Sequence, residues 1–413
     1  MKIRSITFFC NPKYPLDSKV IRGAGDFLVR AKAAYEAAGY EVQTARLATT
    51  PFPALLGEKR MHDAPKMAQE LDLLIPQLGI GYASLGPALP KWRRSYEVVP
   101  ESIAATKNVF FGGVMADRRR GLDLEAVRRC AEIIVQCAPI EPNGFANLRF
   151  AALANVKPGS PFLPAAYHDG TRPAFALGTE AADLAVGAFD GAGSVHEGRR
   201  ALIGEIERHG KALSQVAREL ARSVSADRST RGQGGKFLGI DFSLAPFPAE
   251  ASSLGTAFER LGVASVGLHG SLAAAAILTE CIDRARFPRT GFSGLMLPVL
   301  EDAILAQRAA RGTLTIKDLL LYSAVCGTGL DTIPLPGDTT AEQIAPALLD
   351  VAALALRLDK PLTARLMPVP NKKAGDATGF DFPYFANSKV MSLDSESLRG
   401  PLSGDEILSL RRR

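Results

Sequence analysis

The sequence predicts an α/β protein in which strands alternate with helices and the strands run mainly parallel. Three observations support this fold class. Apolar stretches of strand length alternate with amphipathic stretches of helix length along most of the 413 residues. The chain opens with a strand, helix and strand pattern, which is the unit of a parallel sheet. No internal repeat is present, so a repeat architecture is not expected.

The predicted elements are assigned from periodicity and from their end signals. The strands are short apolar stretches bounded by Gly, Pro or polar residues. In chain order they cover residues 3–10, 40–47, 108–114, 146–154, 237–242, 264–268 and 363–367. The helices have apolar residues three to four positions apart. They cover residues 21–38, 123–137, 194–223, 249–261, 271–286, 297–311, 316–324 and 339–358.

Local signals support several boundaries. Gly39 is a stop signal between the first predicted helix and the second predicted strand. Acidic residues open the helix predicted at 123–137, and Thr339 followed by Glu342 has the pattern of a capping box. The polar stretch 227–236, rich in Ser, Arg and Gly, is predicted to be a loop. This order of elements places both faces of the sheet under helices.

Length and composition exclude several classes of protein. A mixture of 47% hydrophobic and 22% charged residues is that of an ordinary folded chain, long enough for one large α/β barrel or two domains. No stretch approaches the ~18–20 apolar residues of a membrane helix, and the start lacks the pattern of a secretory signal. The cysteines form no CxxC pair and have no zinc-site spacing. We therefore predict a reduced, cytoplasmic protein with no membrane partner.

The charge pattern limits the expected partners. The formal net charge of +6 lies largely in short basic runs that lack the interleaved aromatic residues of a nucleic-acid surface. We predict no nucleic-acid partner. No P-loop or GxGxxG fingerprint is present, so no nucleotide cofactor is predicted. A small-molecule metabolite is the expected partner, and a homodimer or other homo-oligomer is left open.

Four phrases in the second half of the chain contain most of the candidate chemistry. They are GIDFSLAP (239–246), GLHG (267–270), PVLED (298–302) and CGTGLD (326–331). Each phrase follows or interrupts an apolar stretch and presents ionisable residues beside Gly or Pro. In α/β proteins such strand-end loops converge at one end of the sheet or barrel. We therefore expect these residues to meet in one enzyme site.

Five residues are candidates for catalysis. Asp241 follows a buried strand and could act as a base or cap a turn. His269 lies between two glycines before a helix, and His168 lies in a loop rich in Pro and Gly; both are acid–base candidates. Glu301 is either a catalytic carboxylate or a first-turn residue that interacts with the helix dipole. Cys326 is either a nucleophile or an inert buried thiol.

The same phrases supply candidates for binding. Carboxylate and imidazole ligands suit a divalent ion such as Mg²⁺, Mn²⁺ or Ca²⁺ if they meet in space. The candidate metal ligands are Asp241, Glu301 and His269. The candidate substrate-binding residues are Ser243, Gly270, Gly327 and Asp331.

Taken together, the phrases GIDFSLAPFP, GLHGS, PVLED and CGTGLDTIPLPGDT resemble domain-of-unknown-function family 711, often labelled "PFL family protein". The resemblance covers nearly the whole chain, including the loop from Pro161 to His168. It implies the fold of pyruvate formate-lyase and anaerobic ribonucleotide reductase. That fold is a large ten-stranded α/β barrel of two parallel halves, with a loop inside the barrel. The Cys326 segment is the loop that the resemblance suggests.

The resemblance also implies a domain organisation. Residues 1–413 are expected to form a single barrel domain, with residues 368–413 as a C-terminal extension that covers the barrel mouth. The stretch around Gly379 is the nearest to a glycyl radical phrase, but it lacks the Arg-Val lead of that phrase. No adjacent pair of cysteines is present either. We therefore expect the barrel without the stored radical.

The predicted function is an enzyme that acts on a small carboxylate-bearing metabolite. Its chemistry is expected to be non-radical, as an acid–base or metal-assisted lyase, isomerase or hydrolase. Two alternatives remain open. The first is a non-catalytic metabolite-binding or regulatory protein on the same barrel, and the second is a glycyl radical enzyme.

Overall fold

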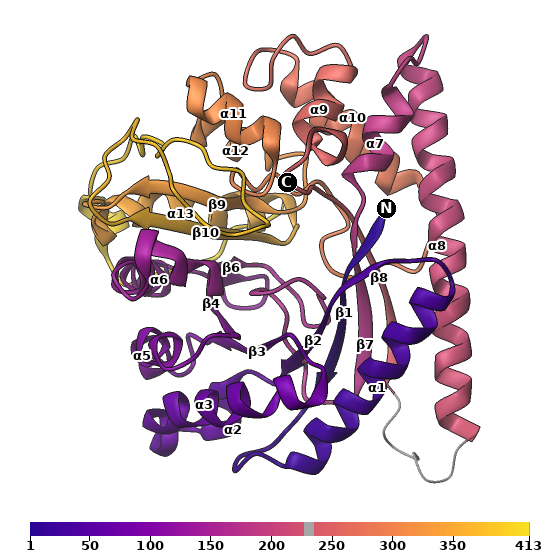
Figure 1. Ribbon diagram of the computed structural model, residues 1–413. Helices are drawn as coiled ribbons and strands as arrows, with labels where there is room; N and C mark the ends of the chain where they lie inside the picture. The colour runs from indigo at the N-terminus through magenta and orange to yellow at the C-terminus, as the bar shows by residue number, and fades with distance from the viewer. Residues whose placement is uncertain (227–234, 413) are drawn as a thin grey trace.

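The computed structural model describes residues 1–226 and 235–412, and most of the loop predicted at 227–236 lies outside them. One large mixed sheet runs through the described part of the chain, with helices packed along its outer side (Figure 1). The predicted α/β class is confirmed. Among the described residues, no helix has both the length and the apolar character needed to cross a membrane.

The sheet has a continuous path of strands and a small branch. The main path runs β8-β7-β1-β2-β3-β4-β6-β10-β9, while β5 pairs with β4 and β11. The strands are β1 (Lys2–Cys10), β2 (Val42–Thr49), β3 (Tyr82–Ala88), β4 (Val109–Asp117), β5 (Gly121–Asp123), β6 (Phe150–Ala154), β7 (Ala174–Glu180), β8 (Lys236–Ala245), β9 (Gly329–Pro336), β10 (Leu362–Val369) and β11 (Ile407–Leu408).

Parallel strands form groups within this path. Strands β1, β2, β3, β4 and β6 are parallel to one another. Strand β7 is parallel to β8, and β10 is parallel to β9. The groups meet at two antiparallel junctions, β1 with β7 and β6 with β10. The helices between successive parallel strands make these connections, as the alternating pattern indicates.

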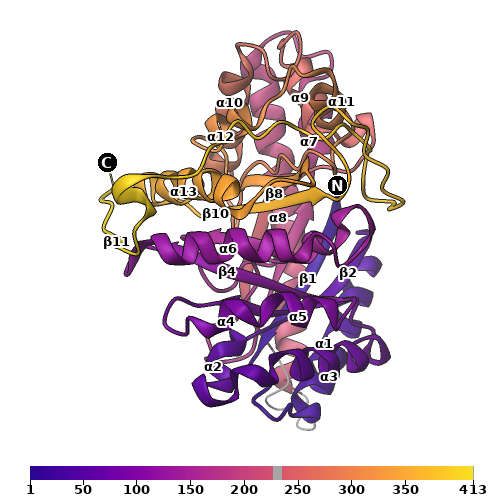
Figure 2. The ribbon, with the colours of Figure 1, turned by 90° about the vertical axis from the view of Figure 1, so that its left-hand side faces the viewer.

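The helices lie mainly on the outer face of the sheet. They are α1 (Ser18–Ala37), α2 (Phe52–Leu56), α3 (Ala64–Leu74), α4 (Arg94–Glu97), α5 (Val99–Ala104), α6 (Leu124–Cys137), α7 (Ala182–Phe189), α8 (Val195–Ala226), α9 (Leu254–Arg260), α10 (Ser271–Arg284), α11 (Ala303–Arg311), α12 (Ile316–Tyr322) and α13 (Ala341–Leu358). The long α8 follows the side of the molecule formed by β7 and β8 (Figure 1). Helices α6 and α13 lie side by side (Figure 2).

Alternation along β1 separates an outer, apolar face from an inner, polar one. On the outer face the ring of Phe8 packs against Phe27 of α1, with 5.1 Å between ring centroids. On the inner face the hydroxyl groups of Ser5 and Thr7 donate to the carbonyl oxygen of Pro161, at 3.3 and 2.7 Å. The proline-rich loop 158–168 is therefore held against the inner face. That the Cys326 segment is the loop inside a barrel stays a prediction.

The segment 288–299 contacts both edge strands of the sheet. The backbone N–H of Leu244 in β8 donates to Gly294 at 3.1 Å, and that of Val299 donates to Asp331 in β9 at 3.1 Å. Parallel bridges pair Leu244 with Leu295 and Pro298 with Asp331. The segment thus connects β8 to β9 through backbone hydrogen bonds.

Several predicted elements differ from the structure. The strand predicted at 146–154 begins only at Phe150, after a 3₁₀ helix that ends at Arg149, and the helix predicted at 249–261 begins at Leu254. Residues 264–268 form turns where a strand was predicted. Gly267 has φ of +100°, and an added Cβ would lie 1.8 Å from the carbonyl oxygen of Thr313, so the backbone here turns and packs closely. The helix predicted at 297–311 begins only at Ala303, because the carboxylate of Asp302 accepts hydrogen bonds from the first-turn N–H groups of Ile304 and Leu305, both at 3.0 Å.

Candidate functional site

A cavity of about 820 Å³ lies on the inner face of the sheet. Its lining combines a charged group of side chains with several aromatic rings. The charged and polar lining includes Arg4, Gln43, Thr44, Arg46, Glu301, Thr328, Asp331, Thr363 and Arg365. The aromatic lining includes Tyr82, Phe110, Phe145, Phe162, Phe292, Phe382 and Tyr384. This volume falls within the range of about 300–1,000 Å³ that is usual for small-molecule sites.

Strands β2 and β10 each direct an arginine into this cavity, and the two arginines lie in the same four-residue sequence. The phrase Thr-Ala-Arg-Leu occurs in β2, where it ends in Arg46 and Leu47, and again in β10 around Arg365. Because side chains alternate along a strand, the Thr and Arg of each phrase share the inner face, while the Ala and Leu pack outward. Both threonines and both arginines line the cavity.

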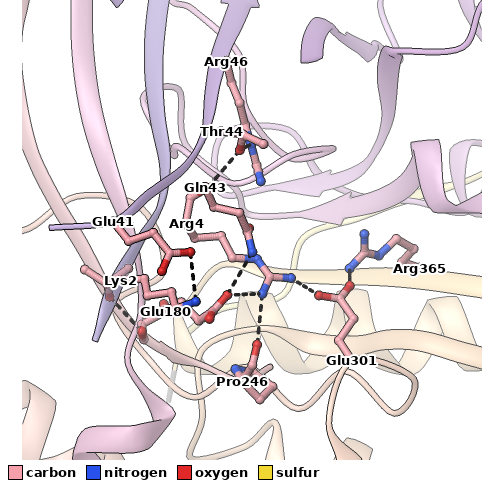
Figure 3. A network of polar contacts seen from close by, with 12 residues as sticks. Lys2, Arg4, Glu41, Gln43, Thr44, Arg46, Glu180, Pro246, Glu301 and Arg365 are labelled. Carbon is pink, nitrogen blue, oxygen red and sulfur yellow. Dashed lines mark hydrogen bonds and ion pairs between the residues drawn. The ribbon is translucent and has the colours of Figure 1, made fainter. Parts of the chain in front are cut away.

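Glu301 is the centre of a buried ion-pair chain (Figure 3). One of its carboxylate oxygens accepts from Arg4, and the other accepts from Nη2 of Arg365 at 2.7 Å. Nη1 of Arg4 also donates to Glu180 at 2.9 Å. Nε of Arg365 donates to Asp331 at 2.6 Å. Three carboxylates and two arginines therefore alternate in a continuous chain across the cavity wall.

The three carboxylates differ in their electrostatic environment. Burial disfavours charge on Glu301, but Arg4, Arg365 and Arg46 together outweigh burial and hold its pKa below the usual value. Burial dominates at Asp331 and raises its pKa, although Arg365 acts in the opposite direction. Burial likewise raises the pKa of Glu180 against the effect of Arg4. Glu301 is thus fixed as an anion, whereas Asp331 and Glu180 hold a proton more readily than usual.

Arg46 is a buried cation that interacts electrostatically with Glu301 but forms no ion pair with a carboxylate among the described residues. Its side chain is 8% exposed, and Nε donates to Oγ1 of Thr44 at 2.7 Å (Figure 3). The guanidinium also lies over the ring of Tyr82, 6.0 Å from the centroid. No ion pair involves Arg46 within residues 1–226 and 235–412. Burial, together with the charge of Arg4, lowers the pKa of Arg46 to about 9. An anion in the cavity would stabilise this charge.

Of the residues proposed from the sequence, the structure places only two, Glu301 and Asp331, in the lining of the described cavity. Glu301 and Asp331 both contact Arg365 and both line the cavity. Cys326 is fully buried and is not part of the cavity lining. Gly327 next to it packs directly on the backbone of Gly294.

The histidines occupy other surroundings. His269 is exposed in the turn before α10, where Gly270 is the N-cap residue with φ of +104°. His168 is buried, with Nε2 3.1 Å from the carbonyl oxygen of Arg172 and Nδ1 accepting from the N–H of Gly170 at 3.2 Å. Both ring nitrogens of His168 are therefore occupied by backbone groups of residues 170 and 172, which fixes the turn around this histidine. Neither histidine lines the cavity.

Asp241 is fully buried in β8 and connects that strand to the segment 288–299. Its carboxylate accepts from the N–H groups of Phe292 and Ser293, both at 2.7 Å. The hydroxyl of Ser243 donates to the same carboxylate at 2.6 Å and accepts from Gly294 at 3.3 Å. Asp241 and Ser243 thus fix the backbone that leads to Glu301.

The proposed metal ligands do not form a cluster. The oxygens of Asp241 are taken by backbone N–H groups, those of Glu301 face two arginines, and His269 is exposed. Across the described part of the chain, no group of three or more His, Cys, Asp or Glu residues has an arrangement that could hold a metal ion. These donors therefore do not fit a divalent cation.

The arginines and Glu180 were not among the residues proposed from the sequence. A recognisable signal was nevertheless present, because Arg4, Arg46 and Arg365 each interrupt an otherwise mainly apolar strand. A long cation inside such a strand needs a partner or a cavity. The Thr-Ala-Arg-Leu phrase adds a second signal, since it repeats in two strands that meet the same cavity.

We expect the replacement of Asp241 by Asn to destabilise the fold, because an amide cannot accept from all three donors and turns its own N–H₂ group toward them. The cost should be about 1–3 kcal/mol for each buried donor left unpaired. Burial raises the pKa of Asp241 to about 6, so between about pH 4 and 6 the folded state binds more protons than the unfolded chain. The stability contributed by this group therefore falls as pH rises through that range.

Urea unfolding of the wild type and Asp241→Asn at pH 4.5 and 7 measures both effects. The stability difference between the two proteins should depend on pH in this range. A difference that is small and independent of pH would contradict the assigned role of Asp241.

Comparison with known proteins places the whole site within one family. Residues 1–387 match the family model described as "Uncharacterised ACR (DUF711)". A UPF0210 protein of Pyrobaculum aerophilum is 33% identical over 359 residues, which cover 82% of this chain and 76% of the relative. UPF0210 proteins of Methanopyrus kandleri and Acetivibrio thermocellus are 30% and 28% identical, covering 87% and 92% of this chain and 81% and 86% of the relatives. The chain therefore belongs to the DUF711 family.

Proposed function

We propose that the cavity binds a small metabolite that carries a carboxylate, and that the protein is an enzyme which transfers a proton on this metabolite. The observation that carries the proposal is Arg46, a buried arginine beside the cavity with no ion pair among the described residues. A buried, unpaired charge is costly unless a partner arrives with the ligand.

The surroundings of Arg46 suit a carboxylate. Its guanidinium can donate two parallel hydrogen bonds, which is the geometry that a carboxylate accepts. Thr44 holds Nε and so fixes the plane of the group, leaving the terminal nitrogens for a ligand. Gln43 and Tyr82 line the cavity nearby and offer further polar contacts.

Asp331 is the proposed acid–base group. Its raised pKa brings the protonated state closer to neutral pH, which favours proton transfer in both directions. In the proposed step its carboxylate takes a proton from a carbon next to the ligand's carboxylate, and the electron pair of that C–H bond stays on the ligand. Return of the proton to another atom gives an isomerase, and departure of a neighbouring group gives a lyase. Glu301 acts as a positioning residue that holds Arg4 and Arg365.

Binding is tested first by thermal melting. Simple carboxylates at millimolar concentration should raise the melting temperature, since any ligand that binds only the folded state does so. The matching neutral amides should leave it unchanged. Equal effects of acids and amides would contradict a carboxylate site. Stabilisation without any product would favour the alternative, a binding or regulatory protein without turnover.

We expect Asp331→Asn to abolish proton transfer while it preserves binding. The readout is deuterium incorporation from D₂O at the carbon next to the carboxylate, followed by NMR. It should fall by about 10²–10⁴-fold, with affinity changed by no more than a few-fold. In the wild type, exchange should fall at acidic pH, with a midpoint above the ordinary Asp pKa of 3.8 because burial raises the pKa of Asp331. Retained exchange in Asp331→Asn would contradict the role.

We also propose that the sheet closes into a single barrel domain of the pyruvate formate-lyase type. Residues 288–299 would be the tenth extended segment of the barrel wall, between β8 and β9. The support is the set of backbone bridges that joins this segment to β8 and to β9. The two antiparallel junctions divide such a barrel into two parallel halves. In this arrangement the C-terminal extension covers the barrel mouth, because Phe382 and Tyr384 line the cavity.

A further inference from the structure

An aromatic strap forms one wall of the cavity. We use this name for residues 380–387, which follow β10 in the chain. Phe380 and Phe385 are 7% and 8% exposed and pack into an apolar cluster with Leu300. Phe382 and Tyr384 are only half-buried, and both line the cavity. Two phenylalanines thus anchor the strap, while two further aromatic side chains are presented to the space beside Glu301.

Hydrogen bonds fix the strap in one conformation. The side chain of Asn387 accepts from the N–H of Phe380 at 2.8 Å and donates to its carbonyl oxygen at 3.1 Å. It also accepts from the hydroxyl of Thr378 at 3.0 Å. The N–H of Ala386 donates to the carbonyl oxygen of Leu300 at 2.6 Å. The aromatic side chains are therefore pre-organised, so that little conformational entropy is lost when a ligand contacts them.

A second segment completes the aromatic wall. Phe145, from the 3₁₀ helix η3 (Pro142–Arg149), packs edge-on against Phe382, with 5.1 Å between ring centroids and 70° between ring planes. Phe382 and Tyr384 are 5.2 Å apart. All three rings belong to the cavity lining. Apolar ring surface held beside a cavity favours an apolar ligand group, because contact with it removes that surface from water.

We infer that the acid bound in this cavity is amphipathic. Its acidic group contacts Arg46, and a planar apolar body, such as an aryl group, packs against Phe382 and Tyr384. This inference rests on the proposed function and specifies its substrate class. The cavity volume of about 820 Å³ supports it, since an acid of two or three carbons would leave most of this space unfilled.

Three probes separate the two parts of such a ligand. Propionate has only the acidic group, 3-phenylpropionate has both parts, and 3-phenylpropanamide has the aryl group without the charge. Isothermal titration calorimetry on the full chain should show that 3-phenylpropionate binds at least tenfold more tightly than propionate. The amide should bind more weakly than 3-phenylpropionate by a similar factor.

The variant Phe382→Ala tests the strap. It should remove most of the advantage of 3-phenylpropionate and leave the affinity for propionate unchanged. The matched control is Phe287→Ala, since Phe287 is also half-buried but lies outside the cavity, against Phe242. The control should keep the full advantage of the aryl acid. Circular dichroism and melting temperature of both variants verify that they fold.

The outcomes distinguish this inference from the proposed function. Equal affinity for the two acids, with both requiring Arg46, would overturn the amphipathic ligand and leave the carboxylate site intact. An aryl preference that survives Phe382→Ala would also overturn the role of the strap. Affinity that is independent of Arg46 for both acids would overturn the proposed function itself. An aryl preference lost only in Phe382→Ala supports the inference.

Discussion

Replacing Glu301 by Gln is expected to lower the free energy of unfolding by about 3–5 kcal/mol. The reason is that Glu301 is the common partner of Arg4 and Arg365, and both arginines are nearly buried. An amide of the same shape leaves two buried cations facing a neutral group. The loss should therefore exceed that of an ordinary ion pair by several-fold. Urea unfolding at neutral pH measures this difference directly.

Glu259 supplies a matched control for this variant. It accepts from Nε and Nη2 of Arg308 at 2.7 and 2.8 Å, but its side chain is only half-buried, with 24% exposed. Glu259→Gln should lower the free energy of unfolding by clearly less than Glu301→Gln, by about 1 kcal/mol, because water still reaches this half-buried pair. Equal losses in Glu301→Gln and Glu259→Gln would contradict the central place of Glu301.

The effect of Glu301 should also depend on pH in a defined direction. Burial works against its charge, but the neighbouring arginines hold its pKa below the ordinary value of 4.5. A carboxylate with a depressed pKa contributes stability that is complete above its unfolded-state pKa and is lost as pH falls through its folded-state pKa. The stability gap between wild type and Glu301→Gln should therefore be constant near neutral pH and narrow below about pH 4.5.

Replacing Arg46 by Met is expected to abolish carboxylate binding without loss of stability. The side chain is buried and has no ion pair in the described residues, and its longer-range attraction to Glu301 does not offset burial, so a similar apolar side chain relieves a desolvation cost. Stability should stay equal or rise by about 1–2 kcal/mol. Affinity for 3-phenylpropionate should fall by at least about 100-fold, since a desolvated, bidentate charge pair is lost. Calorimetry and urea unfolding give the two quantities.

Arg365 is the control that the chain itself provides. Like Arg46, it is the arginine of a Thr-Ala-Arg sequence, here in β10. Unlike Arg46, it donates to both Glu301 and Asp331. Arg365→Met should be strongly destabilising, by about 3–5 kcal/mol, because the largely buried Asp331 loses the arginine with which it pairs and Glu301 keeps only Arg4. A similar destabilisation in Arg46→Met would mean that Arg46 serves the fold and is not reserved for a ligand.

The sequence predicted the fold class better than it predicted the site. Periodicity identified strands such as residues 3–10 and helices such as residues 123–137, because each element has its own apolar pattern. It missed β3, which contains Gly86 and Pro87, residues that ordinarily mark turns. It also placed a strand at 264–268, where close packing of Gly267 on Thr313 requires a turn. That contact depends on residues far apart in the chain.

Contacts between residues far apart in the chain also determine which candidate residues form the site. Glu301 and Asp331 were chosen for their place beside Pro and Gly, and the structure joins them through Arg365. Asp241 was chosen on similar grounds, yet its oxygens are occupied by backbone donors from the segment 288–299. A local pattern marks a carboxylate at a strand end, but only the tertiary structure determines whether it faces a cation, a backbone or a cavity.

Arg46 and this cavity are proposed to hold the acidic group of a small molecule. The most direct measurement is a crystal structure of the full chain with 3-(4-bromophenyl)propionate, in which anomalous scattering locates the bromine. We expect a carboxylate within hydrogen-bond distance of the Arg46 guanidinium and a bromine beside the rings of the aromatic strap. A ligand bound elsewhere, or an empty cavity in which Arg46 pairs with a carboxylate of the protein, would contradict it.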